Sequence, residues 1–437
     1  MNLPQILSLI LLVVILVLAV WRHVNIGLLG FSAAAIMVMV TTAIADGSDT
    51  NTVLSSKDVL SHFPGAIVTL LIGVSLLFAH LEKSGGLSWF TDQIYAKMGH
   101  RTNIVPWIGY FIGFAISTAG AFSTASITLL VPVIAALGRK HPRLFFICEM
   151  AAIIGANTGA LSPINPTGQV ILDAAKKAHV EYSPWLVWFL GMLISFVLVI
   201  ALQIVFQDKR VVETSDSKAP EKGFVLLKPI KQENGDNHQL QPFYAICSTI
   251  AVLIFLILVI FAKANVGLTA LTLAVIMMLF FSQQSKDFVK KIPWNAVVVI
   301  SGLLVFIGTM MQVDTMKAVE QGLLSMTSSK IALLFMLAYL TTFLSNVESS
   351  TLGVISLMIP MVFTIFGDSP QISLILTACA APAMLSVVNP IHIAGTLVVS
   401  VTEEKQQEMM FKRLLIIAFA TVPFFPGLAM IVPALMM

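Results

Sequence analysis

The sequence predicts an all-α polytopic membrane protein built from two inverted repeats, each with five transmembrane helices and one re-entrant hairpin, with broken helices at the midplane. Two observations predict this fold. Hydrophobic residues make up 57% of the 437 residues and charged residues 11%, and the mean hydropathy is +0.93, which leaves too little polar material for a water-exposed surface. In addition, the Leu-Ser-x-x-Asn-Pro pattern of 161–166 returns without a gap at 385–390.

The first half contains five apolar segments of the length that a spanning helix needs at 1.5 Å per residue. The first segment, 3–20, has no preceding basic residue and no small-residue cleavage pattern, so we interpret it as a spanning helix and not as a signal peptide. The other four segments cover 25–44, 63–82, 144–172 and 184–206.

Between the third and fourth spans lies 104–138, which is too long for one crossing and short for two. A re-entrant hairpin fits this length, and its polar centre, 117–126, would form the tip. The second half repeats the order, with spans near 243–262, 266–282, 294–313, 371–400 and 411–435, and with a second hairpin at 330–366 whose polar tip is 345–351.

We therefore expect a first inverted repeat at 1–206, a polar cytoplasmic linker at 207–242 and a second inverted repeat at 243–437. Five crossings is an odd number, so the second repeat must have the opposite orientation. With both termini outside, 19 of the 25 basic residues fall on the cytoplasmic side, as the positive-inside rule requires. The other six are Lys57, Lys176, Lys177, Lys263, Lys317 and Lys330. We expect a multi-pass protein of the bacterial inner (cytoplasmic) membrane.

The sequence offers little for enzymatic chemistry. It has no Gly-rich phosphate-binding loop before a Lys, no Cys and His cluster for a metal, and no Ser in an arrangement that supplies a base. Cys148, Cys247 and Cys379 lie in apolar segments without paired or metal-ligand spacing, which predicts small buried hydrophobic residues. We expect no enzyme and no cofactor beyond possible sodium ions.

The two Asn-Pro pairs indicate where a ligand would bind. Proline removes a backbone donor and clashes with the preceding turn, so Pro166 and Pro390 should each break a spanning helix. The backbone groups freed at membrane depth are tolerated only around a polar cavity. Broken helices at matching places in two halves are typical of the binding site of a secondary transporter.

The tips and breaks supply hydroxyl, amide and backbone groups, without Lys or Arg. Helix N-termini would bind an anion there, whereas freed carbonyl groups suit sodium. Alternatively, Ser and Thr in membrane helices bond to their own backbone or pack small interfaces. The symmetric placement of four polar clusters favours the binding interpretation.

Few ionisable groups lie in the apolar segments. Glu348, in the second tip, is a candidate cation ligand or proton carrier, or is simply solvated in an aqueous vestibule. His392 follows the second break and is a candidate carboxylate partner or proton carrier, or it bonds a freed carbonyl. We expect Glu82 and Glu149 near the cytoplasmic interface, with little functional role.

Four motifs resemble the N-terminal domain of the MatC dicarboxylate (malonate) carriers. They are Asn-Ile-Gly-Leu at 25–28, Phe-Pro-Gly at 63–65, the Ser-rich first tip ending in Leu-Val-Pro at 130–132, and Gly-Ala-Leu-Ser-Pro-Ile at 159–164. The wider layout is similar to the ion transporter superfamily, including the divalent anion:sodium symporters. Those symporters carry Ser-Asn-Thr at both tips, whereas the tips here read Ser123-Thr124-Ala125 and Ser345-Asn346-Val347.

This resemblance implies an elevator transporter, usually dimeric, that moves a C3/C4 dicarboxylate such as malonate or succinate by symport with sodium or protons. The implied ligands of substrate or cation are Ser123, Thr124, Asn165, Thr167, Ser345, Asn346, Ser349, Ser350 and Asn389. Glu348, His392, Pro166 and Pro390 would serve ion coupling. The expected partners are a small carboxylate, a coupling cation, the lipid bilayer and a second copy in a homodimer, and no nucleic acid.

Two alternatives remain open at this point. One is a sodium/proton antiporter of the same superfamily, in which Glu348 exchanges the proton. The other is a membrane binding protein without turnover. Neutral ligands suit malonate, succinate, citrate and related acids alike, so the sequence does not choose among them.

Overall fold

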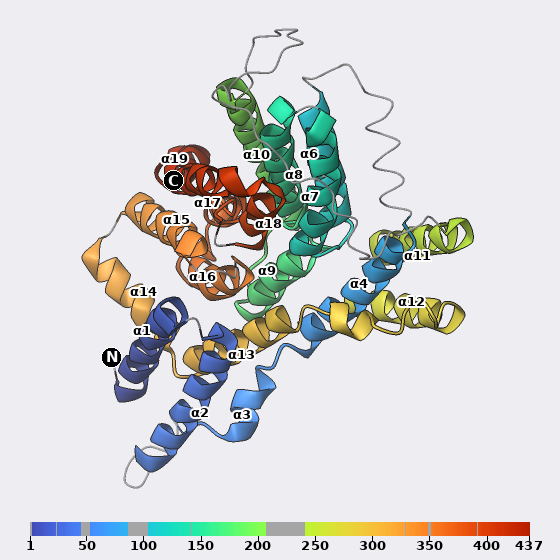
Figure 1. Cartoon of the computed structure of the whole chain (residues 1–437). Helices are drawn as coiled ribbons and strands as arrows, with labels where there is room; N and C mark the ends of the chain where they lie inside the picture. Colours follow the sequence, from blue (N-terminus) through green and yellow to red (C-terminus); the bar gives the residue numbers. More distant parts are fainter. Residues whose placement is uncertain are drawn as a thin grey trace.

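The computed structural model describes residues 2–22, 24–44, 53–85, 104–140, 142–206, 241–327, 329–347, 351–390 and 392–437. Within these ranges the regular elements are helices, without a β-strand (Figure 1). The predicted ligands Glu348, Ser349 and Ser350, and 207–240 of the predicted linker, lie outside the described residues.

The helices of the first half follow the predicted segments closely. They are α1 (Leu3–Arg22), α2 (Ile26–Ile44), α3 (Ser56–Ser61), α4 (Gly65–Lys83), α6 (Val105–Thr118), α7 (Ser123–Lys140), α8 (Pro142–Gly159), α9 (Pro166–Lys177) and α10 (Pro184–Phe206). The short α3 was not predicted. It is nucleated by a capping box in which Ser55 and Asp58 bond each other's backbone amides.

The second half also follows the predicted segments. Its elements are α11 (Pro242–Ile260), α12 (Val266–Phe280), the 3₁₀ helix η2 (Phe288–Lys291), α13 (Trp294–Gln312), α14 (Thr315–Met326), α15 (Lys330–Val347), α16 (Thr351–Phe366), α17 (Ile372–Leu385), α18 (Ile393–Val401) and α19 (Glu404–Met436). The sequence reasoning missed α14 because its polar residues keep it below the hydropathy of a span.

Many of the helices suit a lipid environment. In the described part of the chain, six helices are long and apolar enough to cross a membrane, and seven shorter apolar helices accompany them. Large apolar side chains such as Ile204, Phe280 and Leu279 are more than 70% exposed, which water would oppose and lipid favours. The chain is therefore a multi-pass membrane protein.

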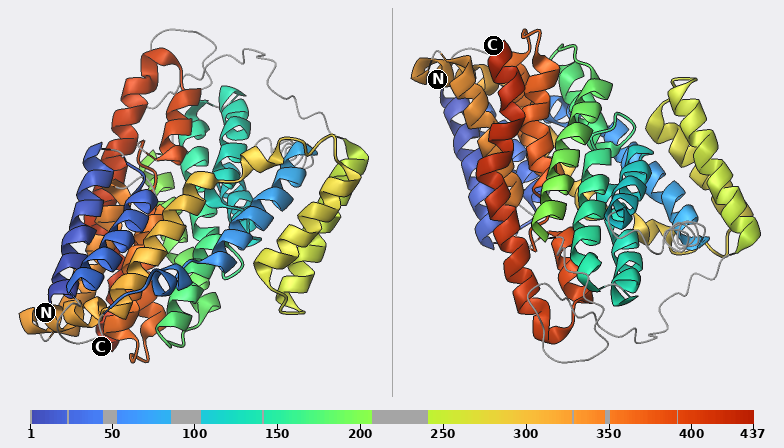
Figure 2. Two further views of the ribbon diagram at one scale, coloured as in Figure 1. Left: turned by 90° about the horizontal axis from the view of Figure 1, so that it is seen from below. Right: turned by 90° about the horizontal axis from the view of Figure 1, so that it is seen from above.

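The helices form two groups that we call the outer layer and the bundle. The outer layer contains α1–α4 and α11–α14, and the bundle contains α6–α10 and α15–α19 (Figures 1 and 2). In the outer layer α2 packs on α13 and α4 packs on α12. In the bundle α7 packs on α18 and α9 packs on α16, while α13 and α4 contact α16 and α9 across the boundary.

Glycines bring the outer-layer helices into close contact. A Cβ at Gly302 in α13 would overlap the backbone of Gly27 in α2, and a Cβ at Gly73 in α4 would lie 2.6 Å from the carbonyl oxygen of Gly267 in α12. Helices α2 and α12, one from each crossing, also begin in the same way. The side-chain oxygen of Asn25 caps α2, and that of Asn265 caps α12.

Both Asn-Pro pairs lie where a helix is interrupted inside the bundle. Helix α8 ends at Gly159 and α9 begins at Pro166, while α17 ends at Leu385 and α18 begins at Ile393. Between α6 and α7 the chain turns through Gly120, whose φ of +116° disfavours other residues. These interruptions and the hairpin turn position the candidate site.

Candidate functional site

Asn165 joins the first helix break to the tip of the first hairpin. Its Nδ2 donates to the carbonyl oxygens of Ser117 and Ala121, both at 2.8 Å. Its Oδ1 accepts from the backbone amide of Thr167 at 3.0 Å and caps α9. Asn165 is fully buried, so its side chain replaces hydrogen bonds that water would otherwise have to supply.

Two further contacts hold the same junction. Ser162 Oγ donates to the carbonyl oxygen of Thr118 at 3.0 Å. The indole of Trp188, on α10, donates to the hydroxyl of Thr118 at 3.2 Å. The first tip is therefore fixed from both the broken helix and the helix beside it.

The second break is tied to the end of α15 in a parallel way. Asn389 Nδ2 donates to the carbonyl oxygen of Asn346 at 2.8 Å, and His392 Nε2 donates to that of Ser345 at 2.9 Å. Asn346 Nδ2 in turn donates to Ser386 Oγ at 2.8 Å, and Ser345 Oγ donates to the carbonyl oxygen of Ala383 at 2.8 Å. All four predicted residues are buried.

One atom of this second junction has no partner among the described residues. The Oδ1 of Asn346 is buried, and no hydrogen-bond donor from the described part of the chain reaches it, although its amide nitrogen is well bonded. A buried amide oxygen normally has a partner, because leaving it unsatisfied costs about 1–3 kcal/mol. The atom is a suitable oxygen ligand for a hard cation such as sodium.

A cavity of about 330 Å³ lies between α4 and the first hairpin. Its wall includes Thr124 and Ser126 on α7, Phe122 at the tip, and Ile393 at the start of α18. Helices α7 and α18 begin at Ser123 and Ile393, so two helix N-termini meet the cavity. The first amides of a helix have no partner within it and carry partial positive charge, which suits an anion.

The cavity also has a charged edge that sequence reasoning missed. Glu82 at the end of α4 and Lys291 in η2 both line it, and their charged atoms lie 3.2 Å apart. Lys291 had no signal of its own in the sequence, because η2 is brought to the cavity by packing. We had expected Glu82 to lie near the interface without a role.

The predicted site residues occupy different places. Thr124 lines the cavity, and Ser123 is the half-buried first residue of α7. Pro166 is the first residue of α9, and Pro390 lies in the turn before α18. The remaining described residues are buried within the two junctions: Asn165, Thr167, Ser345, Asn346, Asn389 and His392.

Glu149 is enclosed by the protein, and its place near the cytoplasmic interface stays a prediction. It lies in α8, fully buried, and neither carboxylate oxygen has a hydrogen-bond partner in the part of the chain that the structure describes. Its neighbours Cys148 and Met150 are also fully buried. Hydropathy placed Glu149 near the start of a span, but the packing of α6 and α7 over α8 encloses it.

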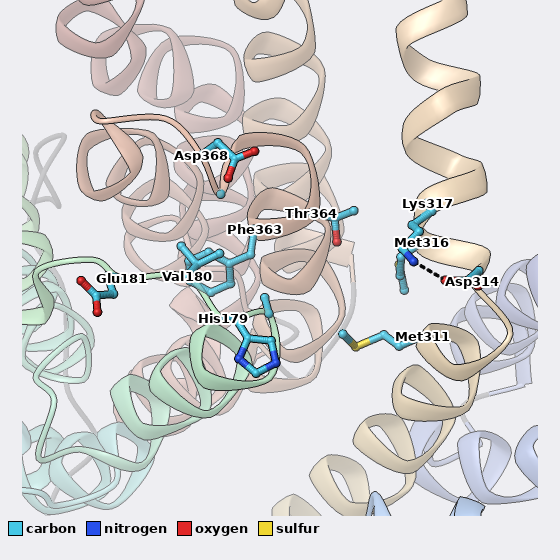
Figure 3. Close-up of a pocket in the computed structure, with 12 residues that line it drawn as sticks. His179, Val180, Glu181, Met311, Asp314, Met316, Lys317, Phe363, Thr364 and Asp368 are labelled. Atoms are coloured by element: carbon cyan, nitrogen blue, oxygen red, sulfur yellow. Dashed lines mark ion pairs between the residues drawn. The ribbon is translucent and has the colours of Figure 1, made fainter.

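A second cavity, of about 350 Å³, opens between the end of α9, the start of α14 and the end of α16 (Figure 3). Its lining includes Glu181, Asp368, and the ion pair of Asp314 and Lys317 at 2.7 Å. The hydrogen bond and the charge of Asp314 raise the pKa of Lys317. None of the predicted site residues lines this cavity, and no group of three potential metal ligands occurs among the described residues.

The apolar helices, the interrupted helices and the cavity against a hairpin tip define a membrane transporter. The family model CitMHS, described as "Citrate transporter", matches residues 14–381. The chain therefore belongs to the citrate transporter family, whose members are secondary carriers. This match does not confirm the more specific resemblance to the MatC-like dicarboxylate carriers.

A solved structure has a similar fold. The crystal structure of the YdaH transporter from Alcanivorax borkumensis, reported to have an unusual topology, aligns with a TM-score of 0.54 and 13% identity over 98% of this chain and 97% of that one. At this identity the likeness concerns the fold alone. A comparison of the sequence with curated proteins finds no match.

Proposed function

We propose that the protein is a secondary active transporter of small carboxylates, coupled to sodium or protons. The observation that carries the proposal is the cavity at Thr124, where the N-termini of α7 and α18 meet. Two helix N-termini attract a carboxylate, because their first amides carry partial positive charge and have no partner within the helix.

The substrate is a small di- or tricarboxylate. The family description names citrate, and the sequence motifs resemble carriers of C3/C4 dicarboxylates such as malonate and succinate. A cavity of about 330 Å³ is at the small end of ligand pockets, which agrees with an acid of this size. Thr124 and Ser123 would donate hydroxyl hydrogen bonds to it.

The coupling cation would bind at the second junction. The support for this assignment is the Oδ1 of Asn346, which has no hydrogen-bond partner among the described residues. Ser345 and Glu348 are close to Asn346 in the chain, and Asn389 donates to its backbone carbonyl oxygen. Asn165 and Thr167 would form the corresponding site at the first junction. Movement of one coupled cation charge across 100 mV supplies about 2.3 kcal/mol. This free energy would drive uptake of the carboxylate.

We further propose that the chain has two inverted repeats, 1–206 and 243–437, and works by an elevator mechanism. The helix contacts support this, because they come in pairs that a two-fold relation between the halves would interchange. The contact of α2 with α13 corresponds to that of α12 with α4, and the contact of α7 with α18 corresponds to that of α16 with α9. The bundle would be the moving part and the outer layer the scaffold of a homodimer. Both termini would lie outside the bacterial inner membrane, so that Glu82 and Lys291 mark the cytoplasmic end of the cavity.

Uptake by proteoliposomes tests the proposal. Purified protein is reconstituted and given labelled citrate, malonate and succinate, with sodium and pH gradients imposed separately. We expect gradient-dependent uptake of at least one of these acids, and no uptake by liposomes that lack the protein. Absence of uptake across the panel under both gradients contradicts the proposal.

A sodium/proton antiporter is the second candidate, because the buried and unpartnered Glu149 is a group that such an exchanger uses to bind protons. In that case, sodium would leave the vesicles in exchange for protons without any carboxylate. A pH-sensitive dye inside the same vesicles distinguishes the two functions. Membership of the citrate transporter family favours a carrier over a binding protein without turnover.

A further inference from the structure

The described wall of the cavity at the first hairpin contains one pair of opposite charges. Among the described residues that line it, Glu82 and Lys291 are the charged ones. Their charged atoms are 3.2 Å apart, and their side chains are 40% and 37% exposed. Both belong to the outer layer and line the same cavity as Thr124 and Thr128 of α7.

The position of Lys291 is fixed by packing beneath it. Phe288, in the same 3₁₀ helix, is buried and lies edge-on to His80 of α4, with ring centroids 4.7 Å apart. His80 is itself held by Tyr244 at 2.7 Å. The ammonium of Lys291 lies 5.9 Å from the centre of the Phe288 ring. The packing of Phe288 on His80 therefore holds η2 against α4 and places Lys291 at the cavity.

The ion pair itself is weak. Side chains that are more than one third exposed interact through water, and such pairs contribute little to stability. An arriving carboxylate can replace Glu82 as the partner of Lys291 at little cost, and the cavity offers it two helix N-termini in addition. Lys291 can therefore exchange Glu82 for a carboxylate of the substrate.

We infer that Lys291 is a binding residue for the anionic substrate at the mouth of the cavity, and that Glu82 competes with the substrate for it. This inference rests on the proposed carboxylate transport. In the empty protein Lys291 is neutralised by Glu82. When a di- or tricarboxylate enters, one of its carboxylate groups bonds Lys291 Nζ while another approaches the start of α7.

A purely structural role for the pair makes a different prediction. If the pair only ties η2 to α4, removal of either charge has the same effect. If Lys291 binds substrate and Glu82 competes, removal of the two charges has opposite effects on affinity. The sign of the change therefore separates the two roles.

The experiment measures equilibrium binding of labelled citrate, malonate and succinate to the full-length protein in detergent. We expect Lys291→Gln to weaken binding about tenfold, the value of one charge-assisted hydrogen bond, and Lys291→Arg to restore much of it. We expect Glu82→Gln to strengthen binding about two- to threefold, because the competitor is gone. Lys290→Gln is the matched control, since Lys290 is paired with Asp287 at 2.6 Å and is 81% exposed.

The outcomes distinguish the two proposals. If the wild-type protein binds none of the three acids, the proposed function fails. If the wild type binds but Lys291→Gln equals Lys290→Gln, the role of Lys291 is overturned. Should Lys291→Gln fail to fold, Glu82→Gln still decides, because unchanged or weakened binding by that variant overturns the competition.

Discussion

At the scale of single residues, two asparagines hold the candidate site together. Asn165 and Asn389 come from different halves of the chain, and each donates to backbone carbonyl oxygens at the end of a hairpin helix. Their positions before proline made them visible in the sequence. The bonds that they form were not visible, because the hairpins lie more than 40 residues away in the chain.

We predict that Asn165→Ala and Asn389→Ala each destabilise the protein by about 1–3 kcal/mol, since buried carbonyl groups lose their donors. Thermal unfolding of the purified variants measures this loss. Gln283→Ala is the control, because Gln283 is an exposed amide side chain in the turn after α12. An unfolding temperature equal to that of the control would refute the structural role of either asparagine.

Glu149 leads to an opposite prediction. A buried carboxyl group without partners costs stability, and replacement by an apolar residue of similar volume is commonly neutral or stabilising by about 1–4 kcal/mol. We expect Glu149→Met to unfold at the same temperature as the wild type or higher, in the same assay. A clear loss of stability would show that Glu149 has a partner which this conformation does not contain.

The position of Lys291 at the cavity could not be predicted from the sequence. The cavity joins α4, the first hairpin, η2 and α18, which are separated by more than 300 residues at the extremes. Motifs and hydropathy describe neighbours in the chain. They place Thr124 at a tip, but they do not say which distant lysine faces it.

At the scale of elements, the helix breaks depend on more than proline. Helix α19 continues through Pro423, Pro426 and Pro433, and α16 continues through Pro360. At Pro166 and Pro390 the preceding asparagine bonds a hairpin instead of extending the helix. The Asn-Pro pair therefore predicts the break, whereas proline alone does not.

The glycine crossings of the outer layer give a prediction at the same scale. A Cβ at Gly302 would overlap the backbone of Gly27, so Gly302→Ala must separate α13 from α2. We expect a destabilisation of about 1–3 kcal/mol, measured by thermal unfolding. Gly322→Ala in α14 is the matched control, because nothing lies within 4 Å of that Cβ and alanine is the better helix former. Equal effects of the two substitutions would argue against the close crossing.

At the scale of the whole molecule, hydropathy predicted nearly every long apolar helix. It did not predict that α2 pairs with α13 and α4 with α12, because pairing depends on which small residues meet in the folded protein. The amphipathic α14 was missed for a related reason, since a helix that lies along other helices needs only one apolar face.

The proposed orientation is testable by cysteine labelling in intact cells. A cysteine at Lys177 or Lys263 should react with an impermeant thiol reagent from outside, and a cysteine at Lys290 or Lys405 only after permeabilisation, because basic residues concentrate on the cytoplasmic side. Residues 263 and 290 flank α12, so labelling of both from one side would contradict the topology.

The central claim is that a carboxylate binds in the cavity between α4 and the first hairpin. Substrate protection of a cysteine at Thr124 tests it most directly, in a background where Cys148, Cys247 and Cys379 are replaced by Ala. Citrate or succinate should slow the reaction of this cysteine with a thiol reagent severalfold, and leave the rate at an exposed Ser400→Cys control unchanged. Equal labelling rates at Thr124→Cys with and without a transported acid would contradict the account.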